Sequence, residues 1–166
     1  IGVQGFYDCV NLTDVVDLGM CEVLSGNAFN GCESLTYVGS LTSCKSLEYS
    51  VFDGCKSLTE VKNLSNCESI GNWVFRDCSN LKSVGDLDAC KTIGNYAFFS
   101  CKSLESVNLG SQITYVGEYA FEDCTSLKNM TCLAVEVPEA HYPFVFCDLA
   151  DATLRVPDES VEAYKS

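Results

Sequence analysis

One unit decides the fold of this chain, and it reads IGNWVFRDCSNLKSV from Ile70 to Val84. Its pattern recurs every 23 residues without insertion or deletion. Strict self-similarity at a period between about 20 and 50 residues is typical of a solenoid, in which each repeat buries its apolar face against its neighbours. The sequence therefore predicts a repeat solenoid. Three columns hold one residue type in all six copies: Phe6, Phe29, Phe52, Phe75, Phe98 and Phe121; Cys9, Cys32, Cys55, Cys78, Cys101 and Cys124; Leu12, Leu35, Leu58, Leu81, Leu104 and Leu127.

Two aliphatic columns predict the strands. We expect a β-strand around the valine column, a shorter extended piece around the isoleucine column, and a helical or 3₁₀ turn between the isoleucine and the cysteine. Stacked strands lie about 4.7–4.9 Å apart, so six copies give a core on the order of 30 Å long. We also expect the six phenylalanines to stack in one buried column. The two aliphatic columns are Val15, Val38, Val61, Val84, Val107 and Met130, and Ile1, Leu24, Leu47, Ile70, Ile93 and Val116.

The repeat resembles that of a known family. The pattern I-G-x-x-A-F-x-x-C-x-x-L-x-x-V is similar to the BspA-type leucine-rich repeat of bacterial and some protist surface proteins, over roughly residues 1–131. Ser25 and Glu48 depart from it by replacing the glycine. Copies one to four also lack the family's usual proline after the strand and carry a second cysteine column instead. The resemblance implies adhesion to extracellular matrix or other cell-surface proteins. The second cysteine column is Cys21, Cys44, Cys67 and Cys90.

We expect one domain with two parts. Residues 1–131 form the leucine-rich repeat array of six copies, the first truncated, and residues 132–166 form an irregular C-terminal cap. The period is expected to fail beyond Met130. The ending from Thr153 to Lys165 resembles the family's cap, with a strand followed by a helix whose N-cap is Asp158. Because the chain starts within a repeat, we expect upstream repeats or a cap to be missing from it.

Charge and apolar patterning exclude several partners. The net charge of −13 argues against nucleic acid and against an anionic membrane surface, which both require basic patches. The chain has no run of about 18 apolar residues, so we expect no membrane insertion within it. It fits an extracellular or cell-surface location, which the family resemblance also implies.

Twelve cysteines raise the question of disulfides or zinc. No CxxC occurs, and the two repeat columns hold ten of the twelve. Equivalent Cβ atoms in a column lie about 4.8 Å apart and point the same way, whereas a disulfide needs about 3.5–4.5 Å. The columns are therefore expected to be reduced core ladders. Cys132 and Cys147 lie outside both columns in this interpretation, and a bridge between them stays open.

The sequence offers no distinguishable catalytic group. His141 is the single histidine and lies beside prolines, as surface or capping residues do. Acidic residues fall in turn columns, so no carboxylate pair stands out for glycoside hydrolysis. Gly71, Gly94 and Gly117 are expected to be turn glycines rather than a phosphate-binding loop. We therefore predict a protein that is not an enzyme and that has no cofactor or metal site.

Two stripes stand apart from the stacking columns. The charges of Glu22, Lys45, Glu68 and Lys91 alternate, which predicts a ladder of exposed ion pairs that supports the register. The second stripe is aromatic and lies two residues before the phenylalanine: it consists of Trp73, Tyr96 and Tyr119.

The aromatic stripe is the predicted ligand-binding site. Earlier copies hold Gln4, Asn27 and Ser50 in this column, and the core already has its apolar columns, so we expect the rings to be partly exposed. Rows of accessible aromatics bind proteins and also stack on sugars. The alternative is that the rings pack on one another and shield a turn.

The sequence thus predicts a secreted or surface binding module for an extracellular or cell-surface protein. Two other functions stay open, namely a carbohydrate-binding accessory domain that uses the aromatic stripe, and a structural spacer.

Overall fold

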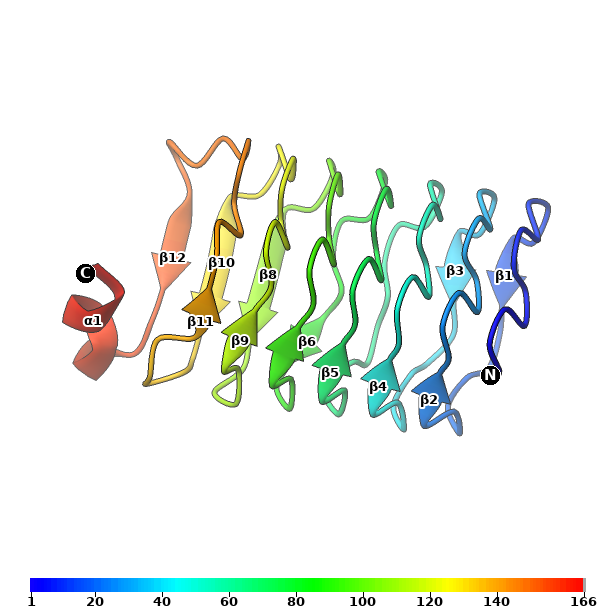
Figure 1. The fold of residues 1–166 in the computed structure, drawn as a ribbon, viewed down its shortest axis with the longest axis horizontal. Helices are drawn as coiled ribbons and strands as arrows, with labels where there is room; N and C mark the ends of the chain where they lie inside the picture. The colour runs from blue at the N-terminus through cyan, green and yellow to red at the C-terminus, as the bar shows by residue number, and fades with distance from the viewer. Residues whose placement is uncertain (166) are drawn as a thin grey trace.

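The computed structural model describes residues 1–165 and is a parallel β-solenoid, as predicted. Its coils stack along the long axis, with the two chain ends at opposite ends of the rod (Figure 1). Short strands alternate between two sides of each coil, and the only helical segments of residues 1–165 follow the last strand. The elements are β1 (Asp14–Val15), β2 (Val23–Leu24), β3 (Tyr37–Val38), β4 (Ser46–Leu47), β5 (Ser69–Ile70), β6 (Asp86–Leu87), β7 (Thr92–Ile93), β8 (Ser106–Leu109), β9 (Tyr115–Val116), β10 (Asn129–Cys132), β11 (Glu139–Ala140), β12 (Thr153–Arg155), a 3₁₀ helix (Asp158–Ser160) and α1 (Val161–Lys165).

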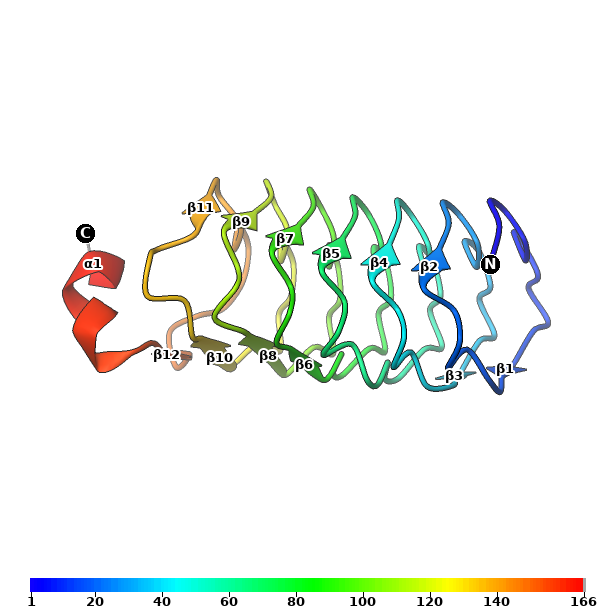
Figure 2. The same ribbon diagram turned by 90° about the horizontal axis from the view of Figure 1, so that it is seen from below.

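The two strand columns lie on opposite sides of the rod (Figure 2). The isoleucine column forms one six-stranded parallel sheet, in the order β11-β9-β7-β5-β4-β2. On the side of the valine column the strands form a pair, β1-β3, and a four-stranded sheet, β12-β10-β8-β6, whose last strand β6 follows Val84. Only isolated bridges at Glu60 link β3 to the next coils. The break between the pair and the sheet occurs because Asn63 and Gly85, which follow Val61 and Val84, have positive φ values of 62° and 69°. These values lie outside the β region. The isoleucine column, predicted to be the minor strand, is therefore the more continuous one.

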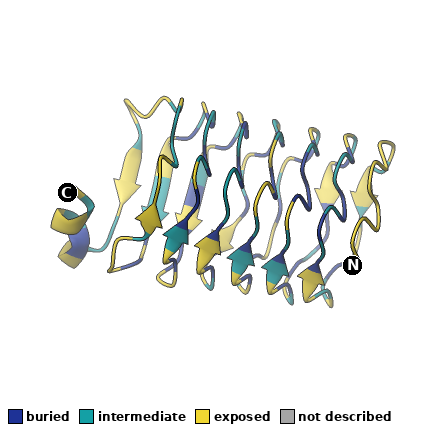
Figure 3. Cartoon of the chain, in the orientation of Figure 1, coloured by how far each residue is buried: buried dark blue, intermediate teal, exposed yellow. Residues whose placement is uncertain are grey.

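The phenylalanine column forms the predicted stack. Successive ring centroids are 5.1 to 5.5 Å apart from Phe6 to Phe121, at interplanar angles of 1° to 20°. The side chains from Phe29 to Phe121 are fully buried, and the apolar core extends from Leu18 to Ala134, with both ends of the rod largely exposed (Figure 3). Phe6 is 38% exposed because only Phe29 covers its ring, so the expectation of a buried residue is wrong at this end.

The segment between the isoleucine and the cysteine is a chain of tight turns. Each turn closes with a bond of the 3₁₀ type, such as Ala28 N–H to Ser25 C=O at 3.1 Å and Cys32 N–H to Phe29 C=O at 3.2 Å. Left-handed residues, such as Asn27 at φ 57° and Gly31 at φ 74°, interrupt the spiral, so no regular helix forms. The intervening N–H groups donate to the next coil instead, as Phe29 N–H does to the carbonyl of Val51 at 2.9 Å.

The repeat geometry continues past Met130, where we expected the period to fail. The strand β11 pairs with β9, with Ala140 opposite Val116. The Phe144 ring stacks on Phe121 at 5.3 Å, and the Cys147 thiol donates to the carbonyl of Phe121 at 2.8 Å. Cys147 therefore belongs to the first cysteine column rather than lying outside it.

The last segment covers the end of the core. Strand β12 pairs with β10, the Ser160 hydroxyl donates to Val135 C=O at 2.8 Å, and the Tyr164 hydroxyl donates to Ala134 C=O at 3.0 Å. The predicted strand and helix are present. The predicted N-cap is wrong, because Pro157 holds that position without a side-chain cap. An N-cap side chain must lie before the first helical residue, whereas Asp158 is that residue.

The cysteine columns are packed as hydrogen-bonding thiols of the core. All twelve cysteines are free thiols, Cys132 and Cys147 included. Each first-column sulfur from Cys32 onward donates to a phenylalanine carbonyl of the preceding coil, as Cys78 does to Phe52 at 3.0 Å. Burial raises the pKa of Cys55, Cys78 and Cys101 well above the ordinary value, so these thiols stay protonated.

The predicted ladder of ion pairs is not continuous. Among the four charged residues Glu22, Lys45, Glu68 and Lys91, only Lys91 and Glu68 form an ion pair within residues 1–165, at 2.7 Å. The backbone supplies the register instead, since Lys45 N–H donates to Glu22 C=O at 2.7 Å and Glu68 N–H donates to Lys45 C=O at 2.8 Å.

Candidate functional site

The aromatic stripe occupies a strained backbone position. Trp73, Tyr96 and Tyr119 have φ values of 59°, 55° and 56°. The left-handed region suits asparagine and glycine and is unfavourable for bulky residues. The same column holds Asn27 at φ 57° and Ser50 at φ 53° in earlier coils. The later coils thus carry large rings where a small polar residue fits better.

The rings of the stripe pack on one another and also remain accessible. Trp73 is 38% exposed, and Tyr96 and Tyr119 are half-buried. The Tyr96 and Tyr119 rings stack with centroids 5.2 Å apart at 28°, and Phe99 meets Tyr96 edge-on at 5.9 Å. The expected partial exposure of the rings is confirmed, and Tyr96 and Tyr119 also pack on one another.

Two further members of this aromatic surface are not predicted from the sequence. Tyr142 continues the column 23 residues after Tyr119, with φ 47° and 73% exposure. Phe99 lies three residues after Tyr96 and supports its ring from the side. The 23-residue offset would have identified Tyr142 if the period had been followed past Met130.

Acidic groups border the stripe. The pKa of the Tyr96 phenol is raised, chiefly by burial and then by the nearby groups of Tyr119, Glu122 and Glu118, in that order. The phenol therefore stays neutral at physiological pH. The Tyr96 end of the stripe thus combines neutral rings with acidic neighbours.

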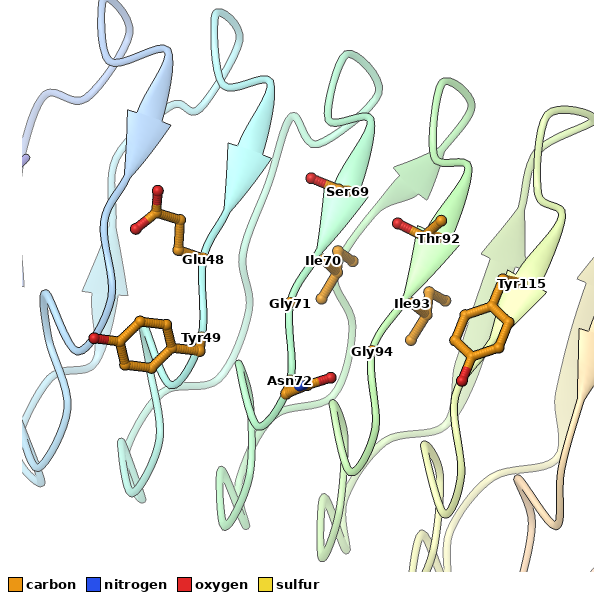
Figure 4. Close-up of a pocket in the computed structure, with 10 residues that line it drawn as sticks. All are labelled: Glu48, Tyr49, Ser69, Ile70, Gly71, Asn72, Thr92, Ile93, Gly94 and Tyr115. Carbon is orange, nitrogen blue, oxygen red and sulfur yellow. The ribbon is translucent and has the colours of Figure 1, made fainter.

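A shallow groove of about 620 Å³ lies beside the stripe on the six-stranded sheet. Its floor is formed by β5, β7 and the residues that follow them, including Gly71 and Gly94 (Figure 4). Tyr49 and Tyr115 stand at its two ends. The Tyr49 ring turns away toward the preceding coil, whereas the Tyr115 hydroxyl lies 3.4 Å from Asn95 Oδ1 in the coil before it.

Asparagine side chains build the border between the groove and the stripe. Asn72 Oδ1 accepts the Asn95 N–H at 2.8 Å, and Asn95 Oδ1 accepts the Glu118 N–H at 3.0 Å. Each asparagine directly precedes a stripe residue, so this ladder fixes the positions of Trp73 and Tyr96. The groove and the stripe are adjacent parts of one rigid flank.

The turn that follows the stripe position carries an ion pair that joins two coils: Arg76 lies three residues after Trp73, and its backbone N–H donates to the Trp73 carbonyl at 3.2 Å. Asp53 is 6% exposed and accepts from Arg76 Nε at 2.9 Å and Nη2 at 2.8 Å, a two-bond fork. Burial raises the pKa of the Asp53 carboxyl, and Arg76 opposes this shift. The two charged groups therefore satisfy each other and link two neighbouring coils.

Other groups with chemical potential are not assembled into a site. His141 is exposed and lies 3.3 Å from Glu139 Oε1, two residues away. Within residues 1–165, no three histidine, cysteine, aspartate or glutamate side chains converge as a metal-ligand set. The same residues contain no helix with the length and apolar character needed to cross a bilayer.

Comparison with known proteins agrees with the coil geometry. The solved structure of a leucine rich cell surface protein from Faecalibacterium prausnitzii is similar, with a TM-score of 0.73 and 25% identity over 83% of this chain. A leucine rich repeat protein from T. pallidum shares the fold, with a TM-score of 0.56 and 24% identity over 87% of this chain. The chain spans only 37% and 58% of those two proteins. No protein in a search of curated sequences matched it.

The sequence pattern of the BspA type leucine rich repeat region matches residues 1–128 as six copies. These copies coincide with the first six coils of the solenoid. The chain therefore belongs to the BspA type leucine rich repeat family.

Proposed function

We propose that this chain is a non-enzymatic binding module at the cell surface. It holds an extracellular or cell-surface protein through the aromatic stripe of Trp73, Tyr96 and Tyr119. The observation that carries the proposal is that three partly exposed rings occupy left-handed positions, where earlier coils hold the small polar residues Asn27 and Ser50. Strained conformations of this kind persist where the surrounding fold enforces them, and they cluster at functional sites. Similarity to a leucine rich cell surface protein supports the location.

The stripe has the features of a protein-binding surface. Tryptophan and tyrosine are enriched among the residues that dominate binding energy at protein interfaces. Here they lie in consecutive coils on a fixed ladder, so little conformational entropy is lost when a partner binds. Tyr142 extends the same surface by one coil.

The double variant Trp73→Asn, Tyr96→Asn tests the proposal. Asn27 holds this column at φ 57°, so asparagine fits the backbone, and we expect a melting temperature within about 3 °C of the parent. Binding to a partner found by screening immobilised matrix and cell-surface proteins should fall at least about tenfold, since each ring at a hot spot is worth about 2 kcal/mol or more. Surface plasmon resonance measures this change.

A matched control lies on the opposite sheet. Tyr37 is 44% exposed, close to the exposure of Trp73, and Tyr37→Asn should leave partner binding unchanged. Equal binding by the stripe variant and the parent would contradict the proposal. Binding of glycans by the stripe in the absence of any protein partner would favour the carbohydrate alternative, and no binding of either kind would favour a spacer.

A further inference from the structure

We propose that the groove between Tyr49 and Tyr115 binds a neutral linear oligosaccharide that runs along the solenoid axis. This site is distinct from the protein contact proposed for the stripe, and different side chains carry it. The groove lies over β5 and β7 and is continuous across two coils (Figure 4).

The groove is preformed by the packing of the coils. A Cβ atom at Gly71 would lie 2.9 Å from the backbone carbon of Glu48, and one at Gly94 would lie 2.6 Å from Asn72 N. Contact between coils therefore requires glycine at both positions. The same column holds Ser25 and Glu48 in the two preceding coils, so the open floor begins at Gly71. A rigid, preformed depression is typical of small-ligand sites.

The polar groups of the groove suit hydroxyl groups. Asn72 uses its Oδ1 to accept the Asn95 N–H, so its amide N–H groups are directed to no partner within residues 1–165. The Thr92 hydroxyl likewise makes no hydrogen bond within these residues. Glu48 accepts the Gly26 N–H through one oxygen, which leaves the other as an acceptor. A sugar hydroxyl both donates and accepts, and it can use each of these groups.

The charge of the groove argues for a neutral sugar. Glu48 is the only charged residue among those that line it, and the whole chain carries a net charge of −13. Uronic, sulfated or sialylated glycans would meet repulsion without a compensating lysine or arginine. The groove is lined by aromatic and hydroxyl groups and by no cation. This lining matches neutral hexoses and N-acetylhexosamines.

The dimensions fit a short chain of sugars. Tyr49 belongs to the third coil and Tyr115 opens the sixth, so these residues are about 14 Å apart along the axis at about 4.8 Å per coil. An extended β-linked glycan repeats at nearly the interval of the coils, which places one sugar over each floor coil. The Tyr115 ring offers a face for the apolar side of a sugar.

A peptide strand fits the groove less well. Adding a strand requires free backbone N–H and C=O groups at a sheet edge. The strands β5 and β7 are interior, because β5 pairs with β4 and β7, and β7 pairs with β9 as well. No edge is available at the floor of the groove.

Titration calorimetry with neutral tetrasaccharides of β-linked glucose, N-acetylglucosamine and mannose tests the site, preceded by an array of linear neutral glycans. We expect Tyr115→Ala to weaken binding about tenfold through the lost ring contact. Thr92→Val keeps the shape of an exposed side chain and should weaken binding a few-fold. The control Tyr37→Ala should bind as the parent does.

Three results would overturn the site. They are no binding to any neutral linear glycan on the array, binding that Tyr115→Ala and Thr92→Val leave unchanged, and tighter binding of anionic glycans than of neutral ones. Loss of sugar binding in Trp73→Asn, Tyr96→Asn alone would assign the sugar to the stripe and also overturn the groove. Loss of protein binding in that variant, with sugar binding intact, keeps the two proposals separate.

Discussion

Replacing Phe75 by alanine is expected to lower the free energy of unfolding by about 3–5 kcal/mol. The side chain is fully buried, and its ring stacks on Phe52 at 5.5 Å and on Phe98 at 5.1 Å. A central coil has a neighbour on each side, so the surroundings have little freedom to collapse into the space left by the ring. Urea unfolding at neutral pH with reductant present measures the loss.

The end of the same column supplies the control. Phe6 is 38% exposed and stacks only on Phe29, so Phe6→Ala should cost clearly less than Phe75→Ala. Equal losses at the two positions would contradict a continuous stack whose interior members are packed on both faces.

Raising the pH above about 8.5 is expected to destabilise the protein progressively. Cys55, Cys78 and Cys101 have pKa values raised well above the ordinary value by burial, and burial raises the pKa of Cys90 to about 11. In the unfolded chain these thiols titrate near pH 8.5. Below that pH both states are protonated, and the full stability is present. Above it only the unfolded chain loses protons, so stability falls as the pH rises toward the folded-state values.

The expected effect is large because several thiols act together. Each contributes about 1.4 kcal/mol per pH unit, so the four together remove about 5–6 kcal/mol between pH 9 and 10. A domain with a stability of about 5–15 kcal/mol then unfolds near pH 10 to 11. Urea unfolding in a pH series with a phosphine reductant measures the slope, and Cys78→Ala should flatten it by about one proton. A stability that stays level from pH 8 to 10 would show that the thiols are not buried as described.

Much of the fold could be predicted because the period fixes which residues share a column. Leu47, Ile70 and Ile93 pair in register, as a 23-residue repeat requires. The end of the period was missed because Ala140 pairs with Val116 at a spacing of 24, although Phe144 returns to 23 after Phe121. A local insertion and a compensating deletion conceal a coil that the structure forms.

The candidate site was only partly predictable. The column of Trp73, Tyr96 and Tyr119 is visible in the sequence, and Asn27 and Ser50 hint at its left-handed backbone. The groove depends on the side-chain orientations of Tyr49 and Tyr115, which the 23-residue repeat does not determine. The Tyr49 ring occupies the space above Gly26, where a Cβ would lie 2.3 Å from its Cζ. Side-chain partners of the charged stripe were equally undetermined, since the spacing permits several pairs and only Lys91 and Glu68 meet.

The central claim, that the aromatic stripe is the binding surface, can be tested most directly at Trp73, the single tryptophan of the chain. Fluorotryptophan incorporated there gives one fluorine resonance, which reports the surroundings of a ring that is 38% exposed in the free protein. We expect a saturating protein partner to shift this resonance and to reduce its response to a soluble paramagnetic probe, in the parent and in Tyr37→Asn alike. A partner that binds while the resonance and its response to the probe stay unchanged would contradict the account.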